Sequence, residues 1–376
     1  MRVLHICSYY TTSQLYKNLF LSLEDVGIEN EVYIPVRVNQ EVNRNIGMDF
    51  KKTNLLYSND YNKFDRFIFK LKVNKIYNSL LRQINIKNID IVHAHSLFVN
   101  GYVAYRLKKE KEVDYIVAVR NTDLNIFFKY MPWMRKIGLN ILRNAKKIIF
   151  ISYPYREETI NKYVPDKYKE EIAQKSHVLP NGVDKFWLDN IRTDKKNYSN
   201  DKIDLIYIGK IDRNKNIVST IKAIDILRSK GYEIDFNIIG KGNYLKVINR
   251  LIKKRNYIKI HGYKNKKELI YLYEKSNIFV MPSKKETFGL VYVEALTQGL
   301  PVIYTKDQGF DGYFEDGKVG FSVNCNDIKD ISSKIEALIN SDLEIYKYCK
   351  DIQNMFDWNK ISIEYKKIYL YTNNEN

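Results

Sequence analysis

Residues 278–301 read IFVMPSKKETFGLVYVEALTQGLP, and they carry two carboxylates eight positions apart, Glu286 and Glu294. The run starts as a β-strand, turns through a loop that contains Glu286, and continues as a helix that contains Glu294. The first amides of such a helix, at Phe288, Gly289 and Leu290, have no carbonyl partner within the helix and form an anion site. The alternative interpretation is an ordinary helix start with acidic capping.

A second loop, residues 209–215 (GKIDRNK), also follows a β-rich run. Gly209 allows a tight backbone turn, and Lys210 and Lys215 are suited to neutralise a diphosphate on which negative charge develops. By itself such a loop is more often a solvated, lysine-rich turn. Lysine cations bind phosphates, and carboxylates accept hydrogen bonds from sugar hydroxyls. Because a nucleotide sugar contains both groups, we expect it as the ligand.

Short β-rich runs alternate with helical segments around these two loops, which predicts parallel βαβ units. The runs lie at 3–7, 32–36, 89–93, 115–119 and 148–152 in the first half, and at 205–208, 236–239, 258–261, 278–281, 301–304 and 320–323 in the second. Helical periodicity lies near 12–26, 62–84, 100–111, 132–145 and 327–371. We predict an α/β protein with two Rossmann-like domains that face each other across a cleft at the carboxyl ends of both sheets.

The pattern is interrupted by a polar stretch, which sets the expected domain boundaries. Residues 1–184 form the first, acceptor-binding domain, and residues 203–357 form the second, nucleotide-sugar-binding domain. Residues 185–202 (KFWLDNIRTDKKNYSNDK) are rich in asparagine and lysine and are predicted to be the linker between them. The final segment, 358–376, is predicted to be a helix that crosses back onto the first domain.

The composition excludes several classes of protein. A chain of 376 residues is too long for one small core, and 45% hydrophobic with 28% charged residues argues against disorder or a fibrous protein. There is no run of about 18 uncharged apolar residues, and residues 1–8 resemble an opening strand rather than a signal peptide. Three cysteines without a CxxC pair support neither a disulfide framework nor a cysteine zinc site. We expect a cytoplasmic protein.

Positive charge is concentrated in the first half of the chain. Lysine and arginine number 62 against 44 acidic residues, a net charge of +18, and residues 51–150 alone hold 20 basic and 7 acidic residues. Two basic amphipathic segments, 61–84 and 127–147, lie in this region. They either cover the sheet or attach the first domain to an anionic membrane surface. No nucleic-acid-binding signature accompanies the charge, so we expect no nucleic-acid partner.

Taken together, these motifs resemble the family 4 retaining glycosyltransferases, which have the GT-B fold of two Rossmann-like domains. The resemblance spans nearly the whole chain. It includes the E-x7-E string from Glu286 to Glu294, which is the most specific motif, and the 209–215 loop. VHAH at 92–95 with Gly101, and PNGVD at 180–184, complete it.

The resemblance implies a role for each matching residue. Lys210, where the family more often has arginine, and Lys215 bind the donor diphosphate together with the Gly209 turn. Glu286 lies by the transferred sugar, and Glu294 holds the ribose hydroxyls. The amides of Thr287, Phe288, Gly289 and Leu290 contact the sugar and phosphates. The family retains anomeric configuration and needs no metal or other cofactor, in agreement with the lack of an Asp-x-Asp motif in this chain.

The sequence departs from the family pattern in the first domain. Residues 8–14 (SYYTTSQ) replace a glycine-rich loop, and Arg120-Asn121-Thr122-Asp123 stands where many members have His-Gly-x-Asp. Arginine cannot act as a base. Arg120 either holds an anionic group of the acceptor or donor, with Asn121 and Asp123 on hydroxyls, or belongs to a structural network at a strand end.

The two histidines of the VHAH string, His93 and His95, are further candidates for the site. We expect His93 and His95 to point in opposite directions from a strand end, so that they cannot form one metal site by themselves. Core packing is the expected role of one of them, and His95 is a candidate for the acceptor side of the site. No metal site is predicted.

The expected activity is therefore transfer of a sugar from a nucleotide-sugar donor, with a UDP-sugar favoured, to a hydroxyl of a glycan or lipid-linked glycan precursor of a surface polysaccharide. Peripheral attachment to the inner face of the membrane would suit such an acceptor. Alternatives are another GT-B enzyme, such as a nucleotide-sugar epimerase or a phosphorylase, and a basic polyanion-binding protein.

Overall fold

The computed structural model describes residues 1–38, 50–62, 64–65, 68–195 and 202–374. The chain divides into two compact units. The first unit contains Met1–Ile151, Tyr155–Gly182 and Trp358–Asn376, and the second contains Ser152–Pro154 and Val183–Asp357. The first unit is therefore built from segments at both ends of the chain.

The first unit is built on a seven-stranded parallel sheet of order β3-β2-β1-β4-β5-β6-β7. Its strands are β1 (Arg2–Ile6), β2 (Glu29–Arg37), β3 (Thr53–Tyr61), β4 (Ile91–Ala94), β5 (Tyr115–Val119), β6 (Lys147–Phe150) and β7 (Ser176–Val178). The central strands are buried on both faces, which explains why β4 and β5 contain no alternation of polar and apolar residues.

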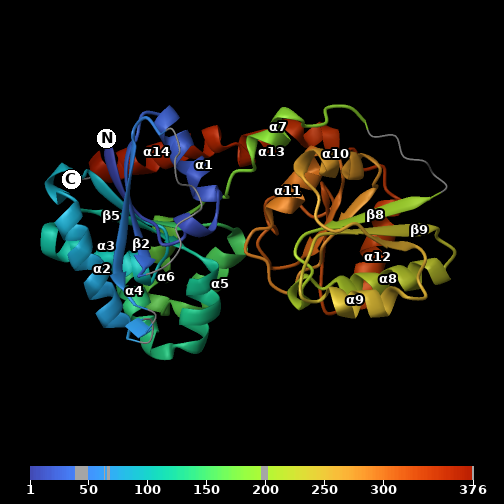
Figure 1. Cartoon of the computed structure of the whole chain (residues 1–376), viewed down its shortest axis with the longest axis horizontal. Helices are drawn as coiled ribbons and strands as arrows, with labels where there is room; N and C mark the ends of the chain where they lie inside the picture. Colours follow the sequence, from blue (N-terminus) through green and yellow to red (C-terminus); the bar gives the residue numbers. More distant parts are fainter. Residues whose placement is uncertain (39–49, 63, 66–67, 196–201, 375–376) are drawn as a thin grey trace. The chain divides into compact units, whose positions relative to one another are not determined.

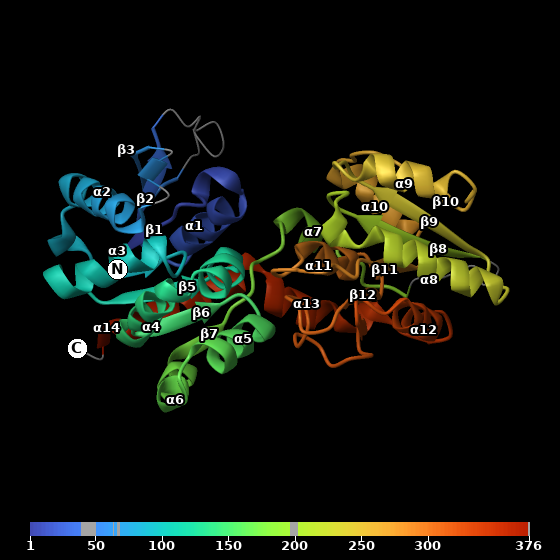
Figure 2. The ribbon, with the colours of Figure 1, turned by 90° about the horizontal axis from the view of Figure 1, so that it is seen from below.

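Helices cover both faces of this sheet (Figures 1 and 2). They are α1 (Leu15–Asp25), α2 (Phe69–Gln83), α3 (Val99–Lys111), α4 (Arg135–Asn144), α5 (Tyr153–Tyr163), α6 (Asp166–Lys175) and α14 (Trp358–Asn374), with short turns η1 (Tyr10–Thr12), η3 (Ile86–Asn88), the π-helix η4 (Asp123–Phe128) and η5 (Pro132–Met134). Helix α14 packs beside α1, and its Trp358, Ile361, Tyr365, Ile368 and Tyr369 join the core formed by β1, β2 and α1.

The second unit has a six-stranded parallel sheet of order β10-β9-β8-β11-β12-β13. Its strands are β8 (Ile203–Ile208), β9 (Ile234–Ile239), β10 (Ile258–Ile260), β11 (Ile278–Val280), β12 (Val302–Thr305) and β13 (Gly320–Val323). Helices α8 (Ile217–Ser229), α9 (Leu245–Ile252) and α12 (Ile328–Ile339) lie on one face of the sheet, and α10 (Lys266–Glu274) and α11 (Leu290–Thr297) on the other (Figure 1). The remaining elements are α7 (Lys185–Asp189), η6 (Arg213–Lys215), η7 (Ile345–Tyr348) and α13 (Cys349–Phe356).

All eleven predicted strands are present, but the first sheet has two more. β3 was not predicted because its second half, SNDY at 58–61, is polar, and β7 was missed because two of its three residues, Ser176 and His177, are polar. The predicted linker is wrong at its start. Residues 185–189 form α7, and Trp187 is 1% exposed within the second unit. Residues 196–201 of that stretch lie outside the described residues.

Among the residues that the structure describes, every helix is too short or too polar to cross a lipid bilayer.

One backbone contact constrains the carboxyl end of the second sheet, and it generates a stability prediction. Gly240 follows β9 with φ +142°, and a Cβ atom there would overlap the carbonyl oxygen of Gly209. Gly231 also has a positive φ, +99°, but a Cβ atom there would meet open space. Gly231→Ala should lower the free energy of unfolding by about 1 kcal/mol, and Gly240→Ala by about 2 to 3 kcal/mol more, because only the second displaces backbone. Urea unfolding followed by circular dichroism checks this, and equal losses would contradict it.

Candidate active site

The loops after β8 and β11 lie together because these two strands are neighbours in a parallel sheet, whose carboxyl ends meet at one edge. Asn214 ties them. Its backbone oxygen accepts from the Lys284 amide at 2.7 Å, its side-chain nitrogen donates to the Lys285 carbonyl at 2.8 Å, and its side-chain oxygen accepts from the Lys285 amide at 3.1 Å. Residues some 70 positions apart in sequence thus form one rigid surface.

An ion pair joins the predicted lysine and the predicted glutamate across these loops. Lys215 Nζ donates to Glu286 Oε2 at 2.6 Å, and the two side chains are 19% and 13% exposed. The other carboxylate oxygen of Glu286 accepts from the Thr287 amide at 3.2 Å, and the Glu286 amide donates to Gln308 Oε1 at 3.1 Å. A cation and a carboxylate are therefore held side by side at the sheet edge.

The short helix η6 sets the direction of Lys215. Asp212 is its N-cap, and Asp212 Oδ1 accepts from the amides of Asn214 and Lys215 at 3.0 and 3.2 Å. Lys210, by contrast, is 69% exposed, with its Nζ 3.7 Å from Asp212 Oδ2. Lys215 is thus fixed by the fold, whereas Lys210 is able to move to meet a ligand.

The start of α11 requires glycine. Gly289 has φ +84°, and a Cβ atom there would overlap the Tyr292 ring. Leu290 is the first residue of α11. The ring of Phe288 is buried and packs near Tyr313 and Phe356, so Phe288 offers only its backbone to the loop.

Glu294 lies one turn further along α11 in a different environment. Burial raises the pKa of its carboxyl to about 7, opposed by the Lys266 charge and a hydrogen bond from the Trp187 side chain, while Asp184 adds to the rise. Lys266 Nζ is itself paired with Asp184 Oδ2 at 2.6 Å. Sequence reasoning missed Trp187 because it placed this residue in a linker. A large apolar residue in a polar stretch was the available signal.

A third loop, after β9, supports the Gly209 turn and was also missed. In addition to the Gly240 contact, a Cβ atom at Gly242 would overlap the carbonyl oxygen of Ile211. The Gly209 amide donates to the Ile239 carbonyl at 3.0 Å, and the Ile211 amide to the Lys241 carbonyl at 2.9 Å. The sequence Gly240-Lys241-Gly242 directly after a strand was the signal that would have identified this loop.

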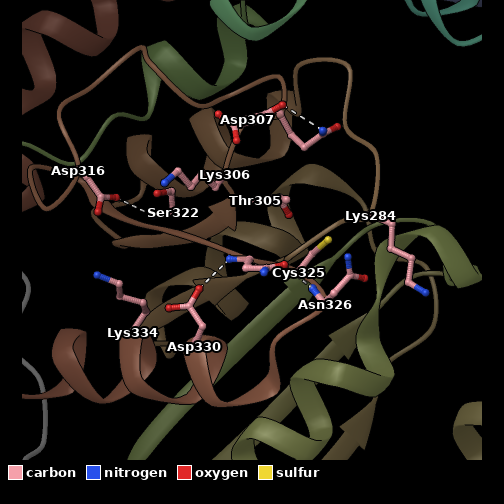
Figure 3. Close-up of a pocket in the computed structure, with 12 residues that line it drawn as sticks. Lys284, Thr305, Lys306, Asp307, Asp316, Ser322, Cys325, Asn326, Asp330 and Lys334 are labelled. Atoms are coloured by element: carbon pink, nitrogen blue, oxygen red, sulfur yellow. Dashed lines mark hydrogen bonds between the residues drawn. The ribbon is translucent and has the colours of Figure 1, made fainter. Parts of the chain in front are cut away.

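A polar hollow of about 660 Å³ lies beside the Glu286 loop, at the ends of β12 and β13 (Figure 3). Its lining includes Lys284, Thr305 and Gln308, and Gln308 also accepts from the Glu286 amide. Across the hollow, Asp316 and Asp330 accept from the backbone amides of Ser322 and Asn324 at 2.6 and 2.7 Å. These two carboxylates shape the hollow by holding its loops.

In the first unit, the structure contradicts the expectation that Asp123 binds substrate hydroxyls. Asp123 is 1% exposed, and its carboxylate accepts from the amides of Leu97, Phe98 and Arg120 at 3.0, 3.2 and 2.8 Å. Burial raises the pKa of Asp123 to about 6, against these hydrogen bonds and the Arg120 charge. Asp123 belongs to the structural network at a strand end, which was the alternative interpretation.

Arg120 directly follows β5 and is 8% exposed, with its Nε 3.4 Å from the His95 carbonyl oxygen. Tyr365 of α14 is a further hydrogen-bond partner. Within the described residues, no carboxylate lies within 4 Å of the guanidinium. Asn121 is partly exposed, and its Oδ1 accepts from Asn125 Nδ2 at 2.7 Å. Of the candidates in the first unit, Asn121 is the one whose side chain is accessible.

The expectation that His93 and His95 point in opposite directions is wrong. Residues two apart on a strand share one face, and the two rings stack with centroids 4.0 Å apart. Both are fully buried, so His95 does not reach an acceptor. His95 Nε2 lies 3.0 Å from His5 Nδ1, and His93 Nδ1 lies 2.8 Å from the Tyr369 hydroxyl.

His5, His93 and His95 also place three nitrogen atoms within 4.8 Å of one another, which is the donor set of a metal site. Their arrangement does not suit one. Two stacked rings cannot both direct a ring-plane lone pair at the same ion, and the nearby Arg120 charge repels a cation. Burial lowers the pKa of all three, to about 3 for His5. The cluster is a neutral packing element.

Two Rossmann-like sheets, with Lys215 and Glu286 at the carboxyl edge of the second and Glu294 on α11, form the architecture that the sequence motifs predict for a glycosyltransferase. Comparison with known families agrees. Residues 189–354 match the family described as "Glycosyl transferases group 1", and residues 29–185 match "Glycosyltransferase Family 4". With both halves matched, the chain belongs to these glycosyltransferases.

Three relatives show the range of the family. An uncharacterised glycosyltransferase of Methanocaldococcus jannaschii is 27% identical over 322 residues, 82% of each chain. The α-monoglucosyldiacylglycerol synthase of Acholeplasma laidlawii is 26% identical over 267 residues, 66% of each. The capsular polysaccharide biosynthesis glycosyltransferase CapM of Staphylococcus aureus is 34% identical over 226 residues, 57% of each.

Solved structures show the fold. A sucrose-phosphate synthase from Thermosynechococcus elongatus superposes with a TM-score of 0.77 at 14% identity, covering 100% of both chains. The Anabaena protein HepE, in complex with UDP and glucose, gives a TM-score of 0.67 at 14% identity, covering 98% of this chain and 99% of that one. The fold is GT-B, as predicted.

The environment of Glu294 predicts an unusual pH dependence of stability. The pKa of a glutamate in the unfolded chain is about 4.5, and burial raises the pKa of folded Glu294 to about 7. Between these values the folded state holds more protons, so the free energy of unfolding falls as pH rises and levels off above about pH 7. In Glu294→Gln the side chain does not ionise, so its free energy of unfolding should not decrease in this way. The variant should be more stable than the wild type by about 2 to 3 kcal/mol at pH 8, but not at pH 4.

The control for this prediction is Glu268→Gln. Hydrogen bonding to Lys264 holds the pKa of Glu268 below its usual value, so its stabilising effect is present at neutral pH and is lost in acid. The two variants should therefore change stability in opposite directions at pH 8, measured by urea unfolding. A pH-independent effect of Glu294→Gln would refute the buried, ionising carboxyl.

Proposed function

We propose that this glycosyltransferase moves a hexose from a UDP-sugar to a hydroxyl of a glycan or lipid-linked glycan precursor of a surface polysaccharide, in the cytoplasm and without a metal ion. The Lys215–Glu286 pair carries the proposal, because it sets a phosphate-binding cation beside a hydroxyl-binding carboxylate. Glu294, one turn along α11, supplies a second carboxylate for the ribose.

The names of related proteins support the donor and the acceptor of this proposal. HepE was crystallised with UDP and glucose, and CapM is named for capsular polysaccharide biosynthesis. The A. laidlawii synthase is named for a glycolipid product. A uridine nucleotide and an acceptor on a glycan or lipid are therefore the natural substrates to test first.

In the proposed reaction the donor diphosphate displaces Glu286 from Lys215 or shares the cation with it. Lys215, and Lys210 once it has swung inward, neutralise the charge that grows on the leaving diphosphate, which is the task a metal performs elsewhere. Glu286 then accepts hydrogen bonds from the sugar. We propose retention of anomeric configuration, with a phosphate oxygen of the leaving group helping to remove the acceptor proton.

The donor site is tested by nucleotide binding without an acceptor. UDP should raise the melting temperature of the wild type more than GDP, ADP or dTDP, since a ligand at about 100 times its dissociation constant adds about 2.7 kcal/mol. Glu294→Ala should lose most of this stabilisation, because a hydrogen bond to a charged group contributes about 1.5 to 3 kcal/mol. Glu336→Ala, on α12 and paired with Lys230 rather than with any residue of the site, serves as the control. Full stabilisation of a folded Glu294→Ala protein would refute the ribose role.

Catalysis is tested at Lys215. Lys215→Ala should reduce turnover by about 100-fold or more while changing donor affinity much less, because the lysine acts mainly on charge that develops as the glycosidic bond breaks. Lys230→Ala is the matched control and should retain full turnover, because Lys230 is also paired with a glutamate, Glu336, at 2.6 Å but lies outside the site. Steady-state kinetics together with calorimetric donor binding separate the two effects. A loss confined to donor binding would contradict the assigned role.

A further inference from the structure

Large apolar side chains are exposed on two segments of the first unit. One is the start of α2 with the turn before it, and the other runs from η4 through η5. The six side chains are Phe64, Ile68, Leu71, Ile126, Tyr130 and Trp133, and Trp133 and Phe64 are 71% and 78% exposed. We call these six residues, with the cations among them, the aromatic-basic surface. Lys63, Arg66 and Phe67 of the predicted amphipathic segment lie outside the described residues.

The two segments contact each other through side chains that face inward. The ring of Phe69 on α2 lies 6.4 Å from that of Phe127 on η4, and Phe127 stacks on the buried Phe98 at 4.5 Å. The inner face of α2, including Val73 and Ile76, is buried. The sheet is thus covered without the exposed residues, so packing within the unit does not explain why their positions are apolar.

The charges beside these apolar groups have one sign. Lys70, Lys129, Arg135 and Lys136 are exposed. In the described residues, these two segments contain two carboxylates, Asp65 and Asp123, and both point inward. Asp65 is 8% exposed and paired with Lys75 at 2.8 Å, and Asp123 is buried. The outward face therefore combines apolar side chains with uncompensated positive charge.

We propose that the aromatic-basic surface docks on an anionic lipid bilayer, with the apolar side chains entering the headgroup layer and the lysines and arginine contacting lipid phosphates. Segments that lie on a membrane surface without crossing it typically combine exposed apolar side chains with neighbouring lysine and arginine residues, as this surface does. A nucleic acid would use the aromatic rings and the cations, but it gives no reason for Ile68, Leu71 and Ile126 to be exposed.

Trp133 provides a direct measurement, because the chain has three tryptophans and the other two, Trp187 and Trp358, are buried. Addition of vesicles with equal parts phosphatidylcholine and phosphatidylglycerol to the full-length protein should shift its tryptophan emission to the blue. Vesicles of phosphatidylcholine alone should shift it far less. Trp133→Phe should abolish the shift yet still co-sediment with the anionic vesicles. A shift produced by a single-stranded oligonucleotide, with none from vesicles, would overturn the proposal.

Two double variants separate the apolar and the charged contributions in co-sedimentation. Tyr130→Ala with Trp133→Ala should reduce binding at least 10-fold, and Lys129→Gln with Lys136→Gln by roughly 25-fold, given the contribution of each cation near an anionic leaflet. The control is Tyr271→Ala with Lys275→Gln, an exposed aromatic–cation pair in the second unit like Lys129 over Tyr130. Unchanged binding in both test variants, or equal binding to neutral vesicles, would overturn the proposal. The test needs no donor or acceptor, so its outcome is independent of the proposed reaction.

Discussion

The ion pair between Lys215 and Glu286 is the interaction around which the second unit is organised. It joins the loops that follow two neighbouring strands. Asp212 caps the short helix that carries Lys215, Asn214 connects the two loops, and Gln308 accepts a hydrogen bond from the Glu286 amide. Each of these three side chains bonds to a backbone amide or carbonyl group of the two loops, which fixes the backbone on both sides of the pair. Without a ligand, each charge satisfies the other. A donor with both phosphate and hydroxyl groups offers partners to both at once.

The environment of Glu294 differs from that of the Lys215–Glu286 pair, because it favours the uncharged carboxyl. Its carboxyl is placed where burial favours the neutral form, with Trp187 and Lys266 only partly restoring the preference for the charged one. Such an arrangement reduces the stability of the empty protein at neutral pH. Under the proposed function, ribose hydroxyls that donate to the carboxylate would offset this cost, so that protein stability and donor binding would favour different residues at this position.

Residues that act through local pattern could be predicted from the sequence. The loop–helix transition around Glu286 and the glycine–lysine loop at 209–215 depend on strand ends and helix starts, which periodicity reveals, and the structure brings Lys215 and Glu286 together. Predictions that required knowledge of long-range packing failed. Asp123 looked available for ligands, but its three amide partners include Leu97 and Phe98, 26 and 25 positions away. Trp187 looked like part of a linker because its burial is decided by α10 and α11, far along the chain.

The return of α14 to the first unit affects how the protein is made. Tyr365 and Tyr369 fill the core beside β1 and α1, and Tyr369 contacts the buried His93. During translation, residues 1–182 leave the ribosome long before residues 358–374 are synthesised, and Val183–Asp357, the main segment of the second unit, emerges in between. The first unit must therefore wait with part of its hydrophobic core uncovered while the second, whose main segment is continuous, can already fold. Nascent chains that stall before α14 should depend most on chaperones.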